Sequence, residues 1–335
     1  MEPLNFPPGG TLVSVERAQQ LILQGHCLCI AGAGHLLEQL PKGVWIAGSI
    51  PYFMAQRGGE TNSEQLLITE IKHFLGVPKI AFYSAQEIQN IAKDAPENGF
   101  SIVIIPAGSS VHEEYARNAP NYEDMYMKPI LGWVSGVHLD HLGKQLPSVA
   151  NGDIGESSQR QAVVMHVELP PDYSAEINTT NLFTQGDGPV FQFPQAGFHA
   201  SQCSVDNDKT VNLAEYIQQN NIDIRLPLVA DYCGMLVNIS IREVGESTVT
   251  FYAPVFDGVD YRFARPLDDY QSQFQQQLPA NTDSIQFSCN CILNYVYCEL
   301  ENKDIAIKGP MTFGEIAYQL LNQTMVYLTV DNTLE

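Results

Sequence analysis

The strongest constraint on the fold is a strand–helix–strand pattern near the N-terminus. Cys27-Leu-Cys-Ile30 is an apolar run typical of a buried strand, and His35 to Leu40 is a short helical stretch ended by Pro41. Val44 to Ile50 is a second apolar strand. Two strands joined through a helix pair in parallel, and helices cover the faces of a parallel sheet. The pattern therefore predicts an α/β protein.

The same order of elements returns near the C-terminus. The sequence predicts a strand at 284–289, a helix at 291–300 and a strand at 305–309. The aligned ends match at four positions, namely Ile46 with Ile307, Gly48 with Gly309, Ile50 with Met311 and Tyr52 with Phe313. Four matches can arise by chance between apolar strands, whereas the repeated order of elements does not depend on these letters. An internal duplication and a chance match are both open.

The middle of the chain adds further helices and strands. Helices are expected at 63–75, 84–93 and 211–219, and strands at 79–83, 100–106, 130–137, 161–168, 223–228, 235–243 and 247–254. Residues 145–160 are polar and contain Gly152 and Gly155, which is typical of an interdomain loop. We therefore predict a mixed α/β (α+β) fold with two similar βαβ-containing halves and mixed sheets, at residues 1–150 and 161–335.

Charge excludes two classes of partner. Asp and Glu number 38 against 17 Lys and Arg, which gives a formal net charge of -21. Nucleic-acid binding requires a positive surface that releases counterions from phosphates, and anionic membranes repel an acidic protein. We expect neither a nucleic-acid nor a membrane partner.

Cysteine usage and the N-terminus favour the cytoplasm. Seven cysteines, among them Cys203, Cys233 and Cys298, are spread over a long chain, which is typical of reduced thiols. The first ten residues lack the basic start and apolar core of a signal peptide, and no apolar run approaches the ~18 residues that span a bilayer.

Two short motifs are weak signals. Gly32-Ala-Gly34 follows a strand, but the third glycine of a dinucleotide fingerprint is replaced by Leu37, so a tight turn explains the pair. His138-Leu-Asp-His141 places two imidazoles close together, which could ligate a metal or haem. No third ligand is marked nearby, so a solvated loop is the favoured interpretation.

Cys289 is the cysteine of most chemical interest. It lies where a strand gives way to a helix, and the helix N-terminus favours a thiolate. A nucleophile also requires a base, whose position the sequence does not give. A small buried residue is the favoured interpretation.

Polar side chains gather after the predicted C-terminal strands. Asn290 and Thr312 each follow a strand, and Glu315 follows Gly314, where the backbone can turn sharply. Ligands of open α/β sheets bind beyond the carboxyl ends of the strands. A pocket for a small polar ligand and a set of caps that tie the loops together are equally supported.

These blocks resemble FIST domains, which are bacterial sensory modules. The resemblance rests on Phe287-Ser-Cys-Asn290, on Gly309-Pro-Met-Thr-Phe-Gly-Glu-Ile316 and on Gly43-Val-Trp-Ile-Ala-Gly-Ser-Ile-Pro-Tyr-Phe53. The chain also resembles uncharacterised bacterial proteins that share the 45–53 block and the block from Gly314 to Thr324. The resemblance implies an N-terminal and a C-terminal FIST-like half that bind a small ligand and signal to a partner. In that family amino acids have been proposed as ligands and some members bind haem. After Cys289, this chain has Asn-Cys where the family often has a basic residue, so ligand identity does not transfer.

We therefore predict a cytoplasmic, non-catalytic sensory protein without a fused output domain. Its small-molecule ligand, for which an amino acid is one candidate, would contact the strand-end residues Gly48, Ser49, Tyr52, Cys289, Asn290, Asn294, Thr312 and Glu315. A separate signalling protein would be the partner, and no cofactor is specified. The alternatives are an enzyme that uses Cys289 or Glu315, and an interaction scaffold.

Overall fold

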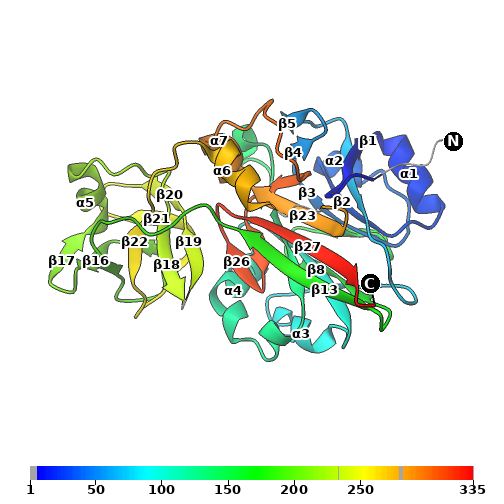
Figure 1. Ribbon diagram of the computed structural model, residues 1–335, viewed down its shortest axis with the longest axis horizontal. Helices are drawn as coiled ribbons and strands as arrows, with labels where there is room; N and C mark the ends of the chain where they lie inside the picture. Colours follow the sequence, from blue (N-terminus) through cyan, green and yellow to red (C-terminus); the bar gives the residue numbers. More distant parts are fainter. Residues whose placement is uncertain (1–5, 233, 279–281, 335) are drawn as a thin grey trace. The chain divides into compact units, whose positions relative to one another are not determined.

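The computed structural model describes residues 6–232, 234–278 and 282–334, and Cys233 and the first five residues lie outside them. The chain divides into two compact units (Figure 1). The first unit contains Met1–Thr180, Gln277–Leu320 and Met325–Glu335, and the second contains Asn181–Gln276 with Leu321–Thr324.

Three six-stranded sheets form the first unit. The first sheet has the order β1 (Thr11–Val13), β6 (Leu66–Glu70), β2 (Leu28–Gly32), β3 (Trp45–Ser49), β10 (Val149–Asn151) and β11 (Glu156–Ser158). The second has the order β7 (Lys79–Tyr83), β12 (Ala162–Glu168), β8 (Gly99–Pro106), β9 (Ile130–Ser135), β25 (Glu315–Ala317) and β26 (Gln319–Leu321). The third has the order β13 (Tyr173–Thr180), β27 (Met325–Asn332), β23 (Ile285–Cys291), β24 (Gly309–Thr312), β4 (Tyr52–Ala55) and β5 (Gly58–Thr61).

The three sheets repeat one pattern. In each, the third and fourth strands are parallel and joined through a helix, as in β2–β3, β8–β9 and β23–β24. The joining helices are α2 (Gly34–Leu37), α4 (Ser110–Asn118) and α7 (Ile292–Tyr297). In each repeat, a later strand then pairs antiparallel with the first strand of the parallel pair. These later strands are β6 next to β2, β12 next to β8 and β27 next to β23. The first unit is therefore built from three topologically equivalent repeats.

The repeats exchange hairpins in a closed ring. The β4–β5 hairpin of the first repeat completes the sheet of the third, and β10–β11 of the second completes the sheet of the first. Strands β25 and β26 of the third repeat complete the sheet of the second. Within the third repeat, β13 and β27 are far apart in the sequence and lie side by side in Figure 1. The exchange makes the repeats mutually dependent.

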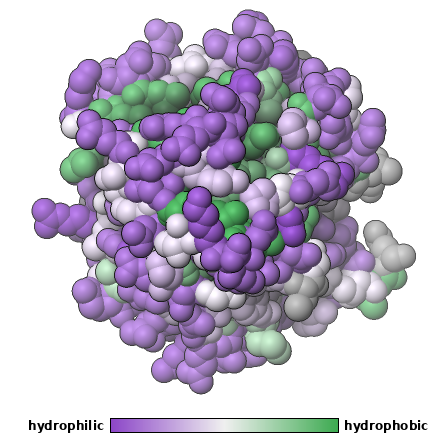
Figure 2. Space-filling model, turned by 90° about the vertical axis from the view of Figure 1, so that its left-hand side faces the viewer, coloured by the Kyte–Doolittle hydropathy of each residue, from purple (hydrophilic) through white to green (hydrophobic). Residues whose placement is uncertain are grey.

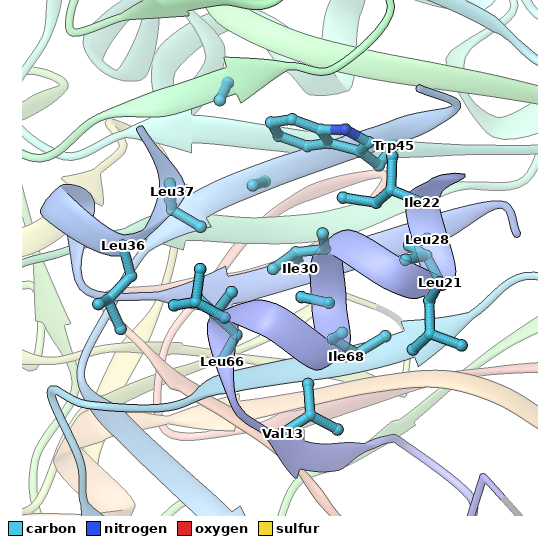
Figure 3. Packing of buried hydrophobic residues seen from close by; sticks show 14 residues of the cluster. Val13, Leu21, Ile22, Leu28, Ile30, Leu36, Leu37, Trp45, Leu66 and Ile68 are labelled. Carbon is cyan, nitrogen blue, oxygen red and sulfur yellow. The ribbon is translucent and has the colours of Figure 1, made fainter. Parts of the chain in front are cut away.

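Helix α1 (Val15–Leu23) covers one face of the first sheet. Ser14 caps it, because its hydroxyl accepts the Arg17 N–H. Its buried residues recur at helical spacing, and Leu21 and Ile22 belong to one apolar cluster with Leu28 of β2 (Figure 3). The remaining helices of this unit are α3 (Ile91–Asp94) and the short 3₁₀ turns Ile88–Asn90, Ala119–Asn121, Met125–Met127 and Leu139–His141.

The second unit interrupts the third repeat between β13 and β23. Its larger antiparallel sheet has the order β17 (Lys209–Asn212), β16 (Gln202–Val205), β14 (Phe191–Gln192), β22 (Tyr261–Phe263), β18 (Leu228–Tyr232) and β19 (Met235–Ile239). A smaller sheet has the order β15 (Gly197–Ala200), β21 (Val249–Val255) and β20 (Ile241–Val244). Its helices are α5 (Leu213–Gln219) and α6 (Tyr270–Gln277).

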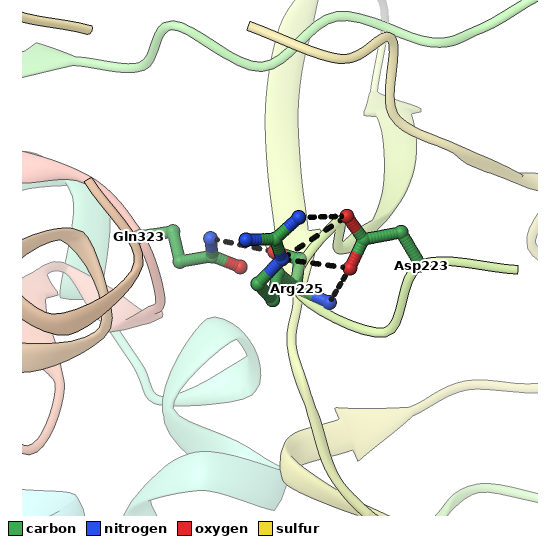
Figure 4. A network of polar contacts seen from close by, with 3 residues as sticks. All are labelled: Asp223, Arg225 and Gln323. Carbon is green, nitrogen blue, oxygen red and sulfur yellow. Dashed lines mark hydrogen bonds and ion pairs between the residues drawn. The ribbon is translucent and has the colours of Figure 1, made fainter. Parts of the chain in front are cut away.

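A distant segment is tied into the second unit. Gln323 donates to the Arg225 carbonyl oxygen at 3.1 Å, and Arg225 forms an ion pair with Asp223 at 2.7 Å (Figure 4). The Ser240 hydroxyl donates to Gln323 Oε1 at 2.7 Å. The buried Gln323 therefore stabilises this unit, which explains the polar end of the block from Gly314 to Thr324.

The predicted mixed α/β class is confirmed, and both predicted strand–helix–strand orders are present, as β2–α2–β3 and β23–α7–β24. The last strand of the C-terminal pattern is Gly309–Thr312, however, and the strand expected at 305–309 is wrong apart from Gly309. A third pattern, β8–α4–β9, was not anticipated. The register places Ser49 opposite Gly32 and Met311 opposite Asn290, each at a strand end next to a helix. Ile50 therefore corresponds to Thr312, one residue from the predicted match with Met311, and such a shift exchanges the sheet faces.

Further local predictions are wrong. The strand expected at 223–228 begins only at Leu228, as β18. The helix expected at 63–75 is instead β6, because this strand pairs on one side with β1 and on the other with β2. The interdomain loop expected at 145–160 contains β10 and β11 and lies within the first unit. The compact units consequently differ from the predicted halves 1–150 and 161–335, because C-terminal strands pair with N-terminal ones.

In the described part of the chain, none of the helices has both the length and the apolar character that a membrane span requires.

Candidate functional site

Three of the predicted ligand residues lie in the core of the first unit. Glu315 is fully buried in β25, where it pairs with Trp133 of β9. Its Oε1 is 3.1 Å from Thr312 Oγ1, which is also 3.2 Å from the Asn290 carbonyl oxygen. One hydroxyl proton serves only one of these oxygens at a time. Because Thr312 is also fully buried, this cluster links strand ends and presents no group to solvent.

Cys289 is the third of these residues. Its side chain is buried, and Sγ donates to the Gly132 carbonyl oxygen at 3.3 Å. Burial first, and then the carboxylate of Glu315, raise the pKa of the thiol well above its usual value. The favoured interpretation of Cys289 as a small buried residue therefore fits the structure, and the alternative of a favoured thiolate does not. Desolvation outweighs the dipole of the six-residue helix α7, which begins at Ile292.

Asn290 and Asn294 tie the end of β23 to the start of α7. Asn290 Oδ1 accepts the Cys291 N–H at 2.7 Å and the Asn294 Nδ2–H at 2.9 Å. Both side chains are buried. Their geometry fits the capping interpretation of these residues.

Gly48 has a packing role. A Cβ atom at this position would lie 2.6 Å from Trp133 Cη2 and 2.6 Å from Ile104 Cγ2. The absence of a side chain lets β3 approach the inner face of the second sheet closely.

Ser49 fastens both ends of a long connection, which we call the 136–148 segment. Its backbone accepts the Gly136 N–H at 2.7 Å and donates to the Ser148 carbonyl oxygen at 2.8 Å. Its hydroxyl donates to the Gly136 carbonyl oxygen at 2.8 Å and accepts the Ser148 N–H at 2.9 Å. A surface segment whose ends meet in this way is an Ω-loop, a class that is frequently functional.

The 136–148 segment has no counterpart in the other repeats. It joins β9 to β10 through 13 residues, whereas Ile50 and Pro51 alone join β3 to β4, and Phe313 and Gly314 alone join β24 to β25. The fold therefore requires only two residues in this connection between strands. The extra residues serve something other than the topology.

Tyr52 holds the middle of the 136–148 segment. Its hydroxyl accepts the Leu139 N–H at 2.9 Å, and its ring stacks on His138 with centroids 5.5 Å apart. The Tyr295 ring lies on α7 with its centroid 5.7 Å from that of Tyr52. Outside these rings the segment is open, because Leu142 and Leu146 are 51% and 68% exposed. Tyr52 and Ser49 thus position a surface element.

The interpretation of His138-Leu-Asp-His141 as a loop fits the 3₁₀ turn observed there. His138 Nδ1 accepts the Asp140 N–H at 3.2 Å, and the two imidazole centroids are 5.5 Å apart. Among the described residues, no group of three His, Cys, Asp or Glu side chains is arranged to hold a metal ion.

A buried polar chain on the opposite face of the second sheet was not predicted from the sequence. Ser101 Oγ is 2.7 Å from His166 Nδ1, and His166 Nε2 is 2.9 Å from the Tyr83 hydroxyl, which donates to Asp94 at 2.8 Å. The order resembles a catalytic relay, but Ser101 is fully buried. This chain of hydrogen bonds therefore ties β7, β8, β12 and α3 together.

A model of a family of unknown function, DUF6976, matches residues 13–331. The chain belongs to this family. Neither a curated protein nor a solved structure matches the DUF6976 chain. Because the family description carries no function, the resemblance to FIST domains stays a prediction.

Proposed function

We propose that this DUF6976 protein binds a small ligand at the 136–148 segment and the tyrosines beneath it. The observation that carries the proposal is the segment itself, which Ser49 fastens at both ends where the other repeats have two residues. A preorganised loop on a rigid scaffold is a common location of binding residues. The predicted residues around Glu315 would then support the scaffold, and the ligand would not touch them.

A non-catalytic role fits the chemistry of the buried residues better than the enzymatic alternative. Cys289 has a raised pKa and is 1% exposed, and Glu315 is fully buried. Neither group is placed to attack a substrate that arrives from solvent. Binding would change the contacts of the 136–148 segment, and a separate signalling protein would sense that change.

We further propose a cytoplasmic location. Six cysteines of the described chain, at positions 27, 29, 203, 289, 291 and 298, are free thiols. Unpaired cysteines in this number are typical of a reducing compartment.

A thermal-shift screen against amino acids, amines, small carboxylates and haem tests the proposal. The variant His138→Ala removes the ring that stacks on Tyr52. The variant Gln145→Ala changes an exposed side chain of the same segment and is the matched control. We expect a hit to raise the Tm of the wild type and of Gln145→Ala. The same rise in the Tm of His138→Ala should need at least a tenfold higher ligand concentration. Hits that stabilise all three proteins equally, or no hit at all, would reject this site.

A further inference from the structure

The chemistry around Tyr52 and Tyr295 points to the charge of the ligand. Resting on the proposed function, we propose that the site recognises an organic ammonium group, such as a primary or quaternary amine.

Two buried tyrosine rings lie beneath the 136–148 segment. The Tyr52 and Tyr295 rings are tilted by 56° with centroids 5.7 Å apart, and the imidazole of His138 lies on Tyr52 at 29°. The faces of tyrosine rings attract cations through their quadrupole, and aromatic cages recognise quaternary ammonium groups. An ammonium group bound beside His138 against Tyr52 or Tyr295 would contact a ring face of this kind.

Carboxylates surround the same two tyrosines. After burial, the carboxylates of Asp140 and Glu301 raise the pKa of Tyr52. Burial, followed by Glu301 and then Glu60 among the carboxylates, raises the pKa of Tyr295, while Thr61 lowers it. A negative potential that disfavours a tyrosinate also disfavours an anionic ligand and favours a cation.

The nearby lysines engage backbone oxygens at the edges of the site. Lys144 Nζ donates to the Asp140 carbonyl oxygen at 3.2 Å, and Lys303 Nζ donates to the Cys298 carbonyl oxygen at 3.3 Å. Among the described residues, no ion pair joins either lysine to Asp140, Glu301 or Glu60, and Asp140 lies 3.6 Å from His138 Nδ1. These three carboxylates are therefore not neutralised by a direct lysine contact.

Tyr295 offers a polar atom that the fold does not use. Its residue is 5% exposed, and its hydroxyl is buried without a hydrogen bond of good geometry to any described group, although Thr61 lies near it. Buried hydroxyls usually have a partner. An N–H group of a primary amine would donate to this oxygen.

A pair of ligands with the same shape tests the charge directly. Isothermal titration would compare choline with its uncharged isostere 3,3-dimethylbutan-1-ol, and putrescine and acetate would serve as a diamine and an anion. We expect choline or putrescine to bind at least tenfold more tightly than the isostere and acetate. Equal binding of the isostere, tighter binding of acetate, or no binding of either amine at 10 mM (roughly the upper limit of a useful affinity) overturns the inference.

Variants locate the effect. Tyr295→Phe keeps the ring and Tyr295→Leu removes it, so choline binding should change by less than about threefold in the first and weaken by about tenfold in the second. Glu301→Gln changes an exposed side chain and should weaken binding by about threefold at low salt, which tests the site even if Tyr295→Leu fails to fold. Unchanged binding in both Tyr295→Leu and Glu301→Gln would also overturn the inference. A neutral or anionic hit that depends on His138 would leave the proposed function intact and reject only the ammonium ligand.

Discussion

At the scale of single residues, side chains that look like ligand contacts in the sequence prove to be parts of the scaffold. Ser49 and Tyr52 fasten the 136–148 segment, and Thr312 and Glu315 share a buried contact. Their polarity and position at strand ends are visible in the sequence. Their burial is not, because it depends on residues 87 or more positions away along the chain.

Gly48→Ala should destabilise the protein by about 1–3 kcal/mol, because the added methyl group overpacks the contact with Trp133 and Ile104. Urea unfolding followed by tryptophan fluorescence measures the change. Gly34→Ala is the control, since its Cβ would meet only Ser148 Oγ at 3.6 Å, and alanine is favourable in a helix. A Gly48→Ala protein as stable as Gly34→Ala would contradict the packing role.

Ser49→Ala should loosen the 136–148 segment. The substitution removes both side-chain hydrogen bonds and leaves the buried Gly136 carbonyl with one donor fewer, which costs about 1–3 kcal/mol. Limited proteolysis should then cut within the segment faster than in the wild type. Ser148→Ala keeps the backbone bonds to Ser49 and should be cut at the wild-type rate. Equal cleavage of the two variants would argue against the fastening role.

At the scale of elements, the three repeats define what each connection needs. The crossings after β3 and β24 take two residues, so the crossing after β9 should also fold with two. Deleting residues 137–147 leaves Gly136 joined to Ser148, and both of these already contact Ser49.

The deletion variant should therefore keep the circular dichroism spectrum of the wild type and lose the thermal response to any ligand of the site. Loss of the spectrum would show that the segment is required for folding. A retained ligand response in a folded variant would place the binding site elsewhere.

Local patterns predict the N-terminal strand–helix–strand unit well because its parts all lie between Leu28 and Ser49. In the C-terminal unit they predict the first strand and the helix but place the last strand at 305–309, before its true position at Gly309–Thr312. The third unit was missed because the sequence predicts its two strands, at 100–106 and 130–137, but not the mostly polar helix Ser110–Asn118 between them. Leu66 to Glu70 was mistaken for a helix, since a short apolar run has no decisive periodicity and its strand partners are set by tertiary contacts. The ring of exchanged hairpins is likewise invisible to any local pattern.

At the scale of the whole molecule, the acidic balance is a surface property. The face in Figure 2 is mostly hydrophilic, with hydrophobic residues in small groups between hydrophilic ones. Several ion pairs, such as Arg117 with Glu113 and Arg265 with Asp187, are exposed and contribute little to stability. The net charge of -21 would attract cations over a longer range, which agrees with an ammonium ligand.

The buried His166 should make the stability of the molecule depend on pH. Burial, together with the charge of Lys79, lowers the pKa of His166 from 6.5 to about 4, against the weaker opposing effect of Asp94. Because the folded-state pKa is the lower one, the unfolded chain takes up the proton first as the pH falls. The stabilisation is therefore complete above about pH 6.5 and is lost progressively toward pH 4, by about 3 kcal/mol.

Urea unfolding of the wild type and of His166→Gln at pH 7, 6, 5 and 4.5 separates this contribution from the titration of the carboxylates, which both proteins share. His112, whose pKa is also lowered to about 4 by burial, is present in both and cancels in the comparison. We expect the wild type to lose more stability than His166→Gln between pH 6.5 and 4.5, so that the gap between the two proteins narrows by about 2–3 kcal/mol. Parallel pH profiles would mean that His166 takes up its proton equally in both states, and that the Ser101–His166–Tyr83–Asp94 chain opens readily in the folded protein.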